Sequence, residues 1–68
     1  MSSATKRVAA RIVVLRQTRG LSQEALAKKS RLNRVTLARL ERAMHPPNLD
    51  TLDRIARALR VKLGDLVR

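Results

Sequence analysis

The side chains best suited to chemistry are arginines that share one helical face between residues 34 and 42. Arg34, Arg39 and Arg42 lie on that face among small residues, and Glu41 is the only acid in the run. Arginine bonds guanine bidentately, and small residues let a helix enter the major groove of B-DNA. A face that only meets solvent more often mixes acids with bases. The pattern therefore indicates contact with DNA, with a solvated face as the alternative.

The charge of the whole chain points the same way. It has 16 basic and 5 acidic residues, a formal net charge of +11. Residues 1–48 hold eleven of the cations and two of the acids, whereas residues 49–68 carry a small positive surplus. Such a surplus indicates a polyanionic partner, either nucleic acid or an anionic membrane. The first two thirds of the chain are therefore expected to meet that partner.

The composition gives little support to catalysis or metal binding. The 68 residues include no cysteine and one histidine, His45, which cannot hold a metal ion alone. No glycine-rich loop could cradle a nucleotide. Aromatic residues are absent, which disfavours stacking on single-stranded bases. We therefore expect no enzymatic activity, no cofactor, no metal and no small-molecule ligand.

The elements that position the arginines are helices, because apolar residues recur every three or four positions and strand alternation is absent. We predict an all-α fold, a compact domain of five helices over residues 5–68, after a flexible tail at residues 1–4. The helices are expected at residues 5–19, 23–30, 34–43, 49–60 and 63–67. Ser22, Asn33 and Asn48 are the predicted N-caps.

Apolar stripes on these helices predict an aliphatic core. Leucine, isoleucine and valine supply 19 of the 68 residues, too many for a disordered chain. The predicted core residues are Val8, Ile12, Leu15, Leu21, Leu26, Leu37, Leu40, Met44, Leu49, Leu52, Ile55, Ala56, Leu59, Leu63 and Leu66. Val13 and Val14 are surplus to this core, and they either close over the last helix or take part in a subunit contact.

Four short runs carry a family resemblance. The chain reads GLSQEALA at residues 20–27, LARLER at 37–42, PNLDTL at 47–52 and IARAL at 55–59. In this order and spacing they resemble the Cro/CI-type, or xenobiotic-response-element-type, helix-turn-helix family, which includes the lambda-type phage repressors. The run KSRLNR at residues 29–34 is also similar to the turn of restriction–modification controller proteins. The resemblance implies a lambda-repressor-like fold and a sequence-specific, double-stranded DNA-binding regulator of transcription.

The resemblance and the side-chain chemistry together imply roles for individual residues. The helix at residues 34–43 is expected in the major groove. Base contacts are expected from Asn33, Arg34, Val35, Thr36 and Arg39. Phosphate contacts, which position the protein without specifying sequence, are expected from Ser22, Gln23, Lys28, Arg31, Arg42 and His45. Arg16 and Glu41 match a family pair in which a buried salt bridge ties the first helix to the third.

The sequence departs from the family at three turns. Arg31, Ala43 and Arg60 stand where the family often has glycine. A residue with a Cβ is disfavoured in the left-handed conformation by about 1–2 kcal/mol, so each turn is either strained or shaped differently. Lys62 also replaces the usual small polar N-cap of the last helix.

A single recognition helix reads few base pairs. We therefore expect a homodimer on a palindromic operator, with half-sites about 34–36 Å apart. The predicted dimer interface consists of Val61, Leu63, Leu66 and Val67, because the last third of the chain is apolar and carries little charge.

Other functions share some of these features. The main alternative is an antitoxin or adaptor whose basic helix-turn-helix surface binds an acidic protein. A cationic membrane-active peptide and a reader of duplex RNA are weaker alternatives, since helix caps and well-placed acids oppose the first and missing aromatics the second. Residues 1–23 imitate an organelle presequence. We expect instead a cytoplasmic protein of a bacterium or phage, associated with the nucleoid and without a membrane partner.

Overall fold

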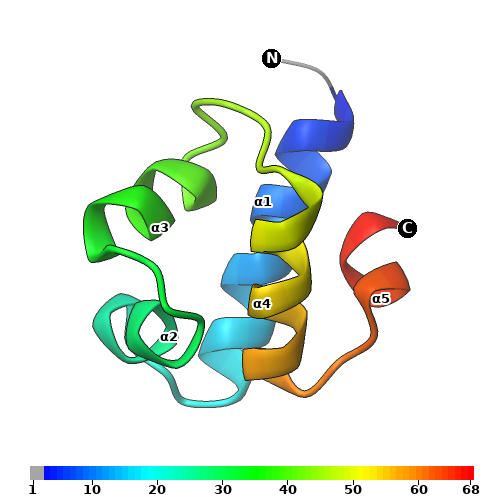
Figure 1. The fold of residues 1–68 in the computed structure, drawn as a ribbon. Coiled ribbons are helices and arrows are strands. Elements are labelled where there is room, and N and C mark those ends of the chain that lie inside the picture. The colour runs from blue at the N-terminus through cyan, green and yellow to red at the C-terminus, as the bar shows by residue number, and fades with distance from the viewer. Residues whose placement is uncertain (1–2) are drawn as a thin grey trace.

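The computed structural model describes residues 3–68, in which five helices and no strand are present (Figure 1). The helices are α1 (Ser3–Thr18), α2 (Gln23–Lys29), α3 (Arg34–Glu41), α4 (Leu49–Leu59) and α5 (Leu63–Val67). The all-α prediction is confirmed. α1 begins earlier than predicted, so Ser3 and Ala4 are helical and do not belong to a tail. The rest of the predicted tail, residues 1–2, lies outside the described residues.

The helices form two groups around a shared centre. α2 and α3 pack against each other at one side of the molecule, and α5 packs against α1 and α4 at the other (Figure 1). α1 also contacts α3, and α4 contacts α2, so every helix has at least two neighbours. This arrangement leaves one side of α3 without a covering helix.

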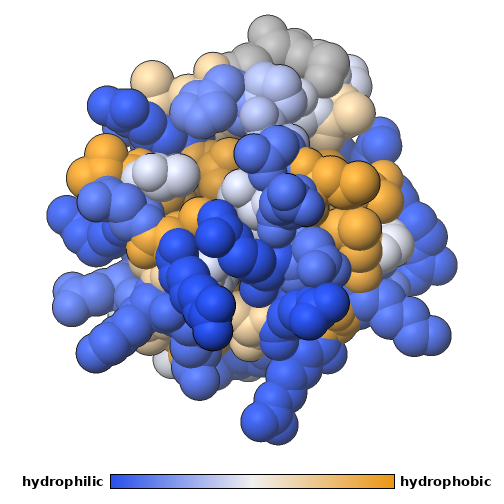
Figure 2. Space-filling model, in the orientation of Figure 1, coloured by the Kyte–Doolittle hydropathy of each residue, from blue (hydrophilic) through white to orange (hydrophobic). Residues whose placement is uncertain are grey.

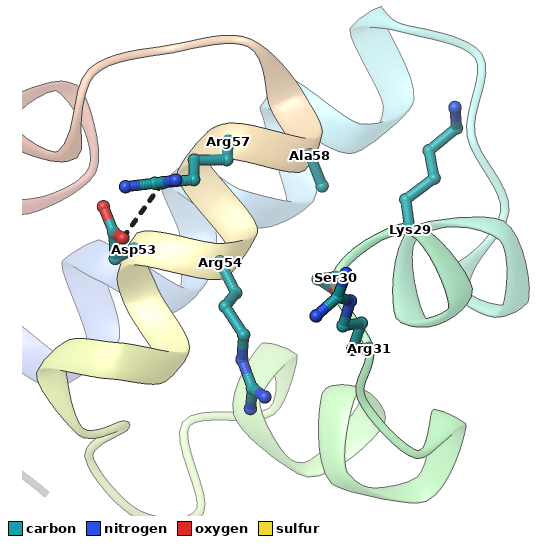
Figure 3. A pocket seen from close by; sticks show the side chains of 7 residues that line it. All are labelled: Lys29, Ser30, Arg31, Asp53, Arg54, Arg57 and Ala58. Carbon is teal, nitrogen blue, oxygen red and sulfur yellow. Dashed lines mark ion pairs between the residues drawn. The ribbon is translucent and has the colours of Figure 1, made fainter.

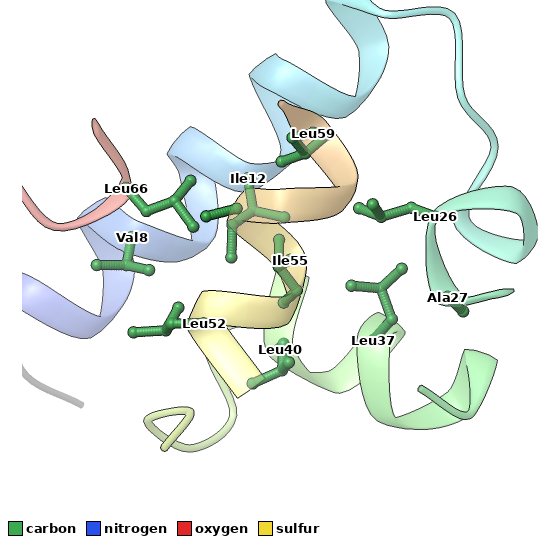
Figure 4. Close-up of a cluster of buried hydrophobic side chains, with 11 residues drawn as sticks. Val8, Ile12, Leu26, Ala27, Leu37, Leu40, Leu52, Ile55, Leu59 and Leu66 are labelled. Atoms are coloured by element: carbon green, nitrogen blue, oxygen red, sulfur yellow. The ribbon is translucent and has the colours of Figure 1, made fainter. Parts of the chain in front are cut away.

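Aliphatic side chains from all five helices meet in one core (Figure 4). The largest fully buried apolar residues are Ile12, Leu26, Leu37, Ile55, Leu59 and Leu66. Full burial of one such side chain contributes about 1.5–3 kcal/mol. Leu15, Leu21 and Leu63 are partly buried and pack against the core.

Two predicted core residues are wrong. Met44 is 52% exposed and Leu49 is 66% exposed. α3 ends at Glu41 and not at residue 43, so its helical periodicity no longer places Met44 on the buried face. Leu49 is the first residue of α4, and the buried stripe of that helix begins one turn later at Leu52.

The predicted N-caps explain where three helices begin. Ser22 Oγ accepts a hydrogen bond from the Ala25 N–H at 3.0 Å, and Asn48 Oδ1 accepts one from the Thr51 N–H at 2.8 Å. Asn33 Oδ1 accepts from the Val35 N–H at 2.7 Å. Each bond satisfies a backbone donor that the first turn of a helix leaves unpaired.

The four left-handed residues within residues 3–68 close helices in the same way. Gly20, Arg31, Ala43 and Arg60 have φ of 67°, 58°, 57° and 60°. The residue after each donates its N–H to the carbonyl five positions earlier, as in Met44 to Arg39 at 3.1 Å. This is the Schellman closure, which favours glycine at the left-handed position. The turns thus keep the shape that glycine favours, and the three residues with a Cβ are strained.

Replacing Ala43 by glycine is expected to raise the free energy of unfolding by up to about 1 kcal/mol. The left-handed conformation disfavours alanine by about 1–2 kcal/mol, and the greater freedom of glycine in the unfolded chain offsets part of this. The same change at Ala10, which is exposed inside α1, should lower stability by about 1 kcal/mol. Urea unfolding of both variants measures whether the two changes in the free energy of unfolding have opposite signs. Destabilisation by both would contradict the strain at Ala43.

Candidate nucleic-acid interface

The candidate interface is built on the uncovered side of α3. Leu37 and Leu40 of this helix are buried in the core. Because the two lie three residues apart, they take one face of the helix and leave the opposite face free. The predicted base-contact residues Asn33, Arg34, Val35, Thr36 and Arg39 are all exposed. Val35 is 50% exposed, which leaves an apolar side chain in water beside arginines.

A buried ion pair fixes the orientation of α3. Arg16 of α1 lies with its Nε 2.7 Å from Oε2 of Glu41, the last residue of α3. A second bond joins Arg16 Nη2 to Glu41 Oε1 at 3.1 Å. The two side chains are only 12% and 4% exposed. The pair is therefore the bidentate arrangement that arginine and carboxylate form best.

Two further bonds complete this network. Arg16 Nη1 donates to the Leu21 carbonyl oxygen at 2.8 Å, and Gln23 Nε2 donates to Glu41 Oε1 at 2.9 Å. No buried side-chain nitrogen or oxygen within residues 3–68 is left without a partner. The network joins α1, the turn before α2, α2 itself and α3. The angle between α2 and α3 is thus set by hydrogen bonds as well as by packing.

The predicted phosphate contacts flank α3 at both ends. Ser22 and Gln23 stand at the start of α2, where Gln23 is partly buried and keeps one N–H beyond its bond to Glu41. Lys28 and Arg31 are exposed at the end of α2 and in the following turn. The remaining two, Arg42 and His45, are exposed after α3. Hydrophilic side chains cover most of the face drawn in Figure 2, with apolar patches between them.

The residues predicted for a dimer interface do not form one exposed patch. Leu66 is fully buried in the core, so its assignment to the interface is wrong. The short helix α5 must anchor itself on α1 and α4, and Leu66 is its anchor. Val61 and Leu63 are partly buried against the core, and Val67 is 42% exposed.

Two other arrangements could not be predicted from the sequence. Arg11 of α1 donates from Nη1 to the Asp65 carbonyl oxygen at 3.1 Å, which ties α1 to α5. Arg54 of α4 lines a hollow together with Arg31. In both cases the residues lie far apart in the sequence, and helix packing brings them together.

The part of the chain that the structure describes has neither a candidate metal site nor a candidate membrane-spanning helix. Residues 3–68 contain no group of three or more side chains that could hold a metal ion. The same residues form no helix that is both long and apolar enough to cross a membrane.

A helix-turn-helix family profile (HTH_3) matches residues 14–66, most of the chain. The chain belongs to the Cro/CI-type helix-turn-helix family. The predicted resemblance is confirmed, and the matched residues form a helix-turn-helix domain of the kind found in DNA-binding regulators of transcription.

Solved structures of helix-turn-helix proteins superpose closely on this chain. The restriction–modification controller protein C.AhdI from Aeromonas hydrophila has a TM-score of 0.91 at 31% identity, and the match covers 96% of this chain and 98% of that one. A hypothetical transcription factor from Neisseria, NHTF, has a TM-score of 0.93 at 27% identity, over 97% of this chain and 76% of that one. The lambda-repressor-like fold of this helix-turn-helix domain is thus found in regulators of different sizes.

A curated relative of this helix-turn-helix chain is the immunity repressor protein of Bacillus phage phi105. The two are 40% identical over 60 residues, which is 88% of this chain. The match spans only 42% of the repressor's length. The similarity therefore concerns one part of that protein.

Proposed function

We propose that the protein is a homodimeric regulator that inserts α3 into the major groove of a palindromic DNA operator. The observation that carries the proposal is the exposed arginine-bearing face of α3, held at a fixed angle by the buried Arg16–Glu41 pair. A recognition helix must keep its orientation to read base edges, because hydrogen bonds to bases are short and directional. Such a regulator acts in the cytoplasm of a bacterium, at the nucleoid.

The proposed contacts fall into two classes. Arg34 and Arg39 are suited to guanine, Val35 to thymine methyl groups, and Asn33 and Thr36 to polar base edges. The cap bond at Asn33 uses its Oδ1 and leaves the side-chain N–H groups as donors. The phosphate contacts would come from Ser22, Gln23, Lys28, Arg31, Arg42 and His45, on both sides of the groove.

Dimerisation is proposed because one α3 reads too few base pairs for discrimination in a genome. The corrected interface centres on Val67, with Val61 and Leu63 at its edge. Val67 also lines a mostly apolar hollow of about 220 Å³ with Val8, Leu52 and two prolines of the loop before α4. Sedimentation should therefore show a dimer, at least on DNA. A monomer at high concentration and on DNA would contradict this part of the proposal.

Selection from a random pool of duplex DNA at near-physiological salt tests the function. We expect enrichment of an inverted repeat whose half-sites lie about one helical turn, or 34–36 Å, apart. The enriched sequence gives both the operator and its symmetry. Bulk binding that is sensitive to salt but selects no sequence would overturn the proposal and favour the antitoxin or adaptor role.

A further inference from the structure

A hollow beside the α2–α3 turn is lined by charged side chains, of which only Arg31 is also a proposed DNA contact (Figure 3). Its volume is about 490 Å³, within the range of sites that hold small ligands. The end of α2 and the following turn contribute Lys29, Ser30 and Arg31 to its lining, and α4 contributes Asp53, Arg54 and Arg57. Because four of these six side chains are cations, the hollow focuses a positive field.

Two guanidinium groups in the hollow have no partner of their own. The side chains of Arg31 and Arg54 extend into the space between the turn and α4 (Figure 3). Within residues 3–68 neither guanidinium group has an ion pair or a hydrogen bond. Asp53 does not neutralise them, because its Oδ2 lies 3.1 Å from Nε of Arg57. Like charges at one hollow repel each other, and an anion between them removes the repulsion.

The left-handed backbone at Arg31, which closes α2, sets where one of these side chains begins. Its φ of 58° is left-handed, a conformation that glycine adopts without strain. Here the strained residue is also the one whose guanidinium group faces the hollow. The Ser30 hydroxyl donates to the Leu26 carbonyl oxygen at 2.5 Å and is already used, so the ligand must be held by cations.

We propose that this hollow binds a small free molecule that carries two linked phosphate groups. The planar forks of Arg31 and Arg54 each match the oxygens of a phosphate, and Lys29 adds a point charge at the rim. Arg31 lies just before Asn33, the cap of α3. Occupancy of the hollow therefore acts on the leading end of the recognition helix.

Titration of the free, ¹⁵N-labelled protein with inorganic pyrophosphate tests the site by NMR. We expect saturable binding of one pyrophosphate, with shifts concentrated at residues 29–31 and 53–58. Arg54→Ala should weaken the binding about tenfold, as loss of a charge-assisted bond does. Arg7→Ala, on a helix that does not line the hollow, is the matched control and should leave the affinity unchanged.

A pair of glycine variants separates ligand binding from folding. Arg31→Gly and Arg60→Gly both relieve a left-handed arginine, so both should melt at a higher temperature than the original chain. Only Arg31→Gly should lose affinity for pyrophosphate. Loss of binding in a more stable protein cannot come from unfolding.

DNA binding by the Arg54→Ala variant identifies the source of the phosphates. If the DNA backbone fills the hollow instead, the slope of log affinity against log salt becomes shallower by about 0.9 per lost contact, and the proposal of a free ligand is overturned. If a free molecule fills it, the variant binds DNA normally and loses only pyrophosphate. Equal pyrophosphate affinity of the original chain and the Arg54→Ala variant would also overturn the proposal. The titration needs no DNA, so its failure is separate from failure of the operator proposal.

Discussion

Replacing Glu41 by alanine is expected to lower the free energy of unfolding by about 3 kcal/mol. The change leaves the buried Arg16 guanidinium without its carboxylate and Gln23 without its acceptor. A domain of this length has a total stability of about 3–10 kcal/mol. The melting temperature should therefore fall by at least about 12 °C. Thermal unfolding followed by far-ultraviolet circular dichroism measures the loss.

An exposed ion pair provides the control for this variant. Asp53 and Arg57 form a pair one turn apart on α4, with side chains 45% and 81% exposed. Asp53→Ala should lower stability by less than about 1 kcal/mol, because water and salt screen such pairs. Similar melting temperatures for Glu41→Ala and Asp53→Ala would show that the buried Arg16–Glu41 pair stabilises the fold no more than an exposed pair does.

Replacing Arg34 by alanine is expected to weaken binding to the selected operator by about 1–3 kcal/mol. On the proposed function, its guanidinium group reads one guanine at the leading end of α3. Loss of that contact should also relax the preference at a single base pair and leave the other positions unchanged. Binding measured against a set of operators, each with one base pair changed, locates the affected position.

Lys28→Ala is the matched control for this change, since it removes a cation proposed to meet only phosphate. It should weaken binding to all sequences alike and reduce the salt slope by about 1. Both side chains are exposed, so neither variant should change the melting temperature much. If the two variants behaved alike across the operator set, the division into base and phosphate contacts would be wrong.

The sequence predicted helix starts better than helix ends. Ser22, Asn33 and Asn48 carry short polar side chains that can bond the first turn of a helix, and each caps one. Helix ends depend on left-handed residues, and at Ala43 nothing in the residue type reveals that conformation. α3 was therefore predicted too long, and Met44 was placed in a core that it does not reach.

Sites made of distant residues were the least predictable. Arg16 and Glu41 could be paired only through the family resemblance, because 25 residues separate them. The hollow at Arg31 and Arg54 depends on α2 packing against α4, which periodicity does not reveal. Leu66 was misassigned for a related reason. A helix of five residues has too few positions for its pattern to show which side is buried.

The division of α3 into two faces has an evolutionary consequence. Leu37 and Leu40 serve the core and Glu41 serves the ion pair, whereas Arg34, Val35 and Arg39 contribute to neither. Substitutions on the exposed face therefore leave folding intact and are free to accumulate. A duplicated copy of this gene can move to a new target one residue at a time, without passing through an unfolded ancestor.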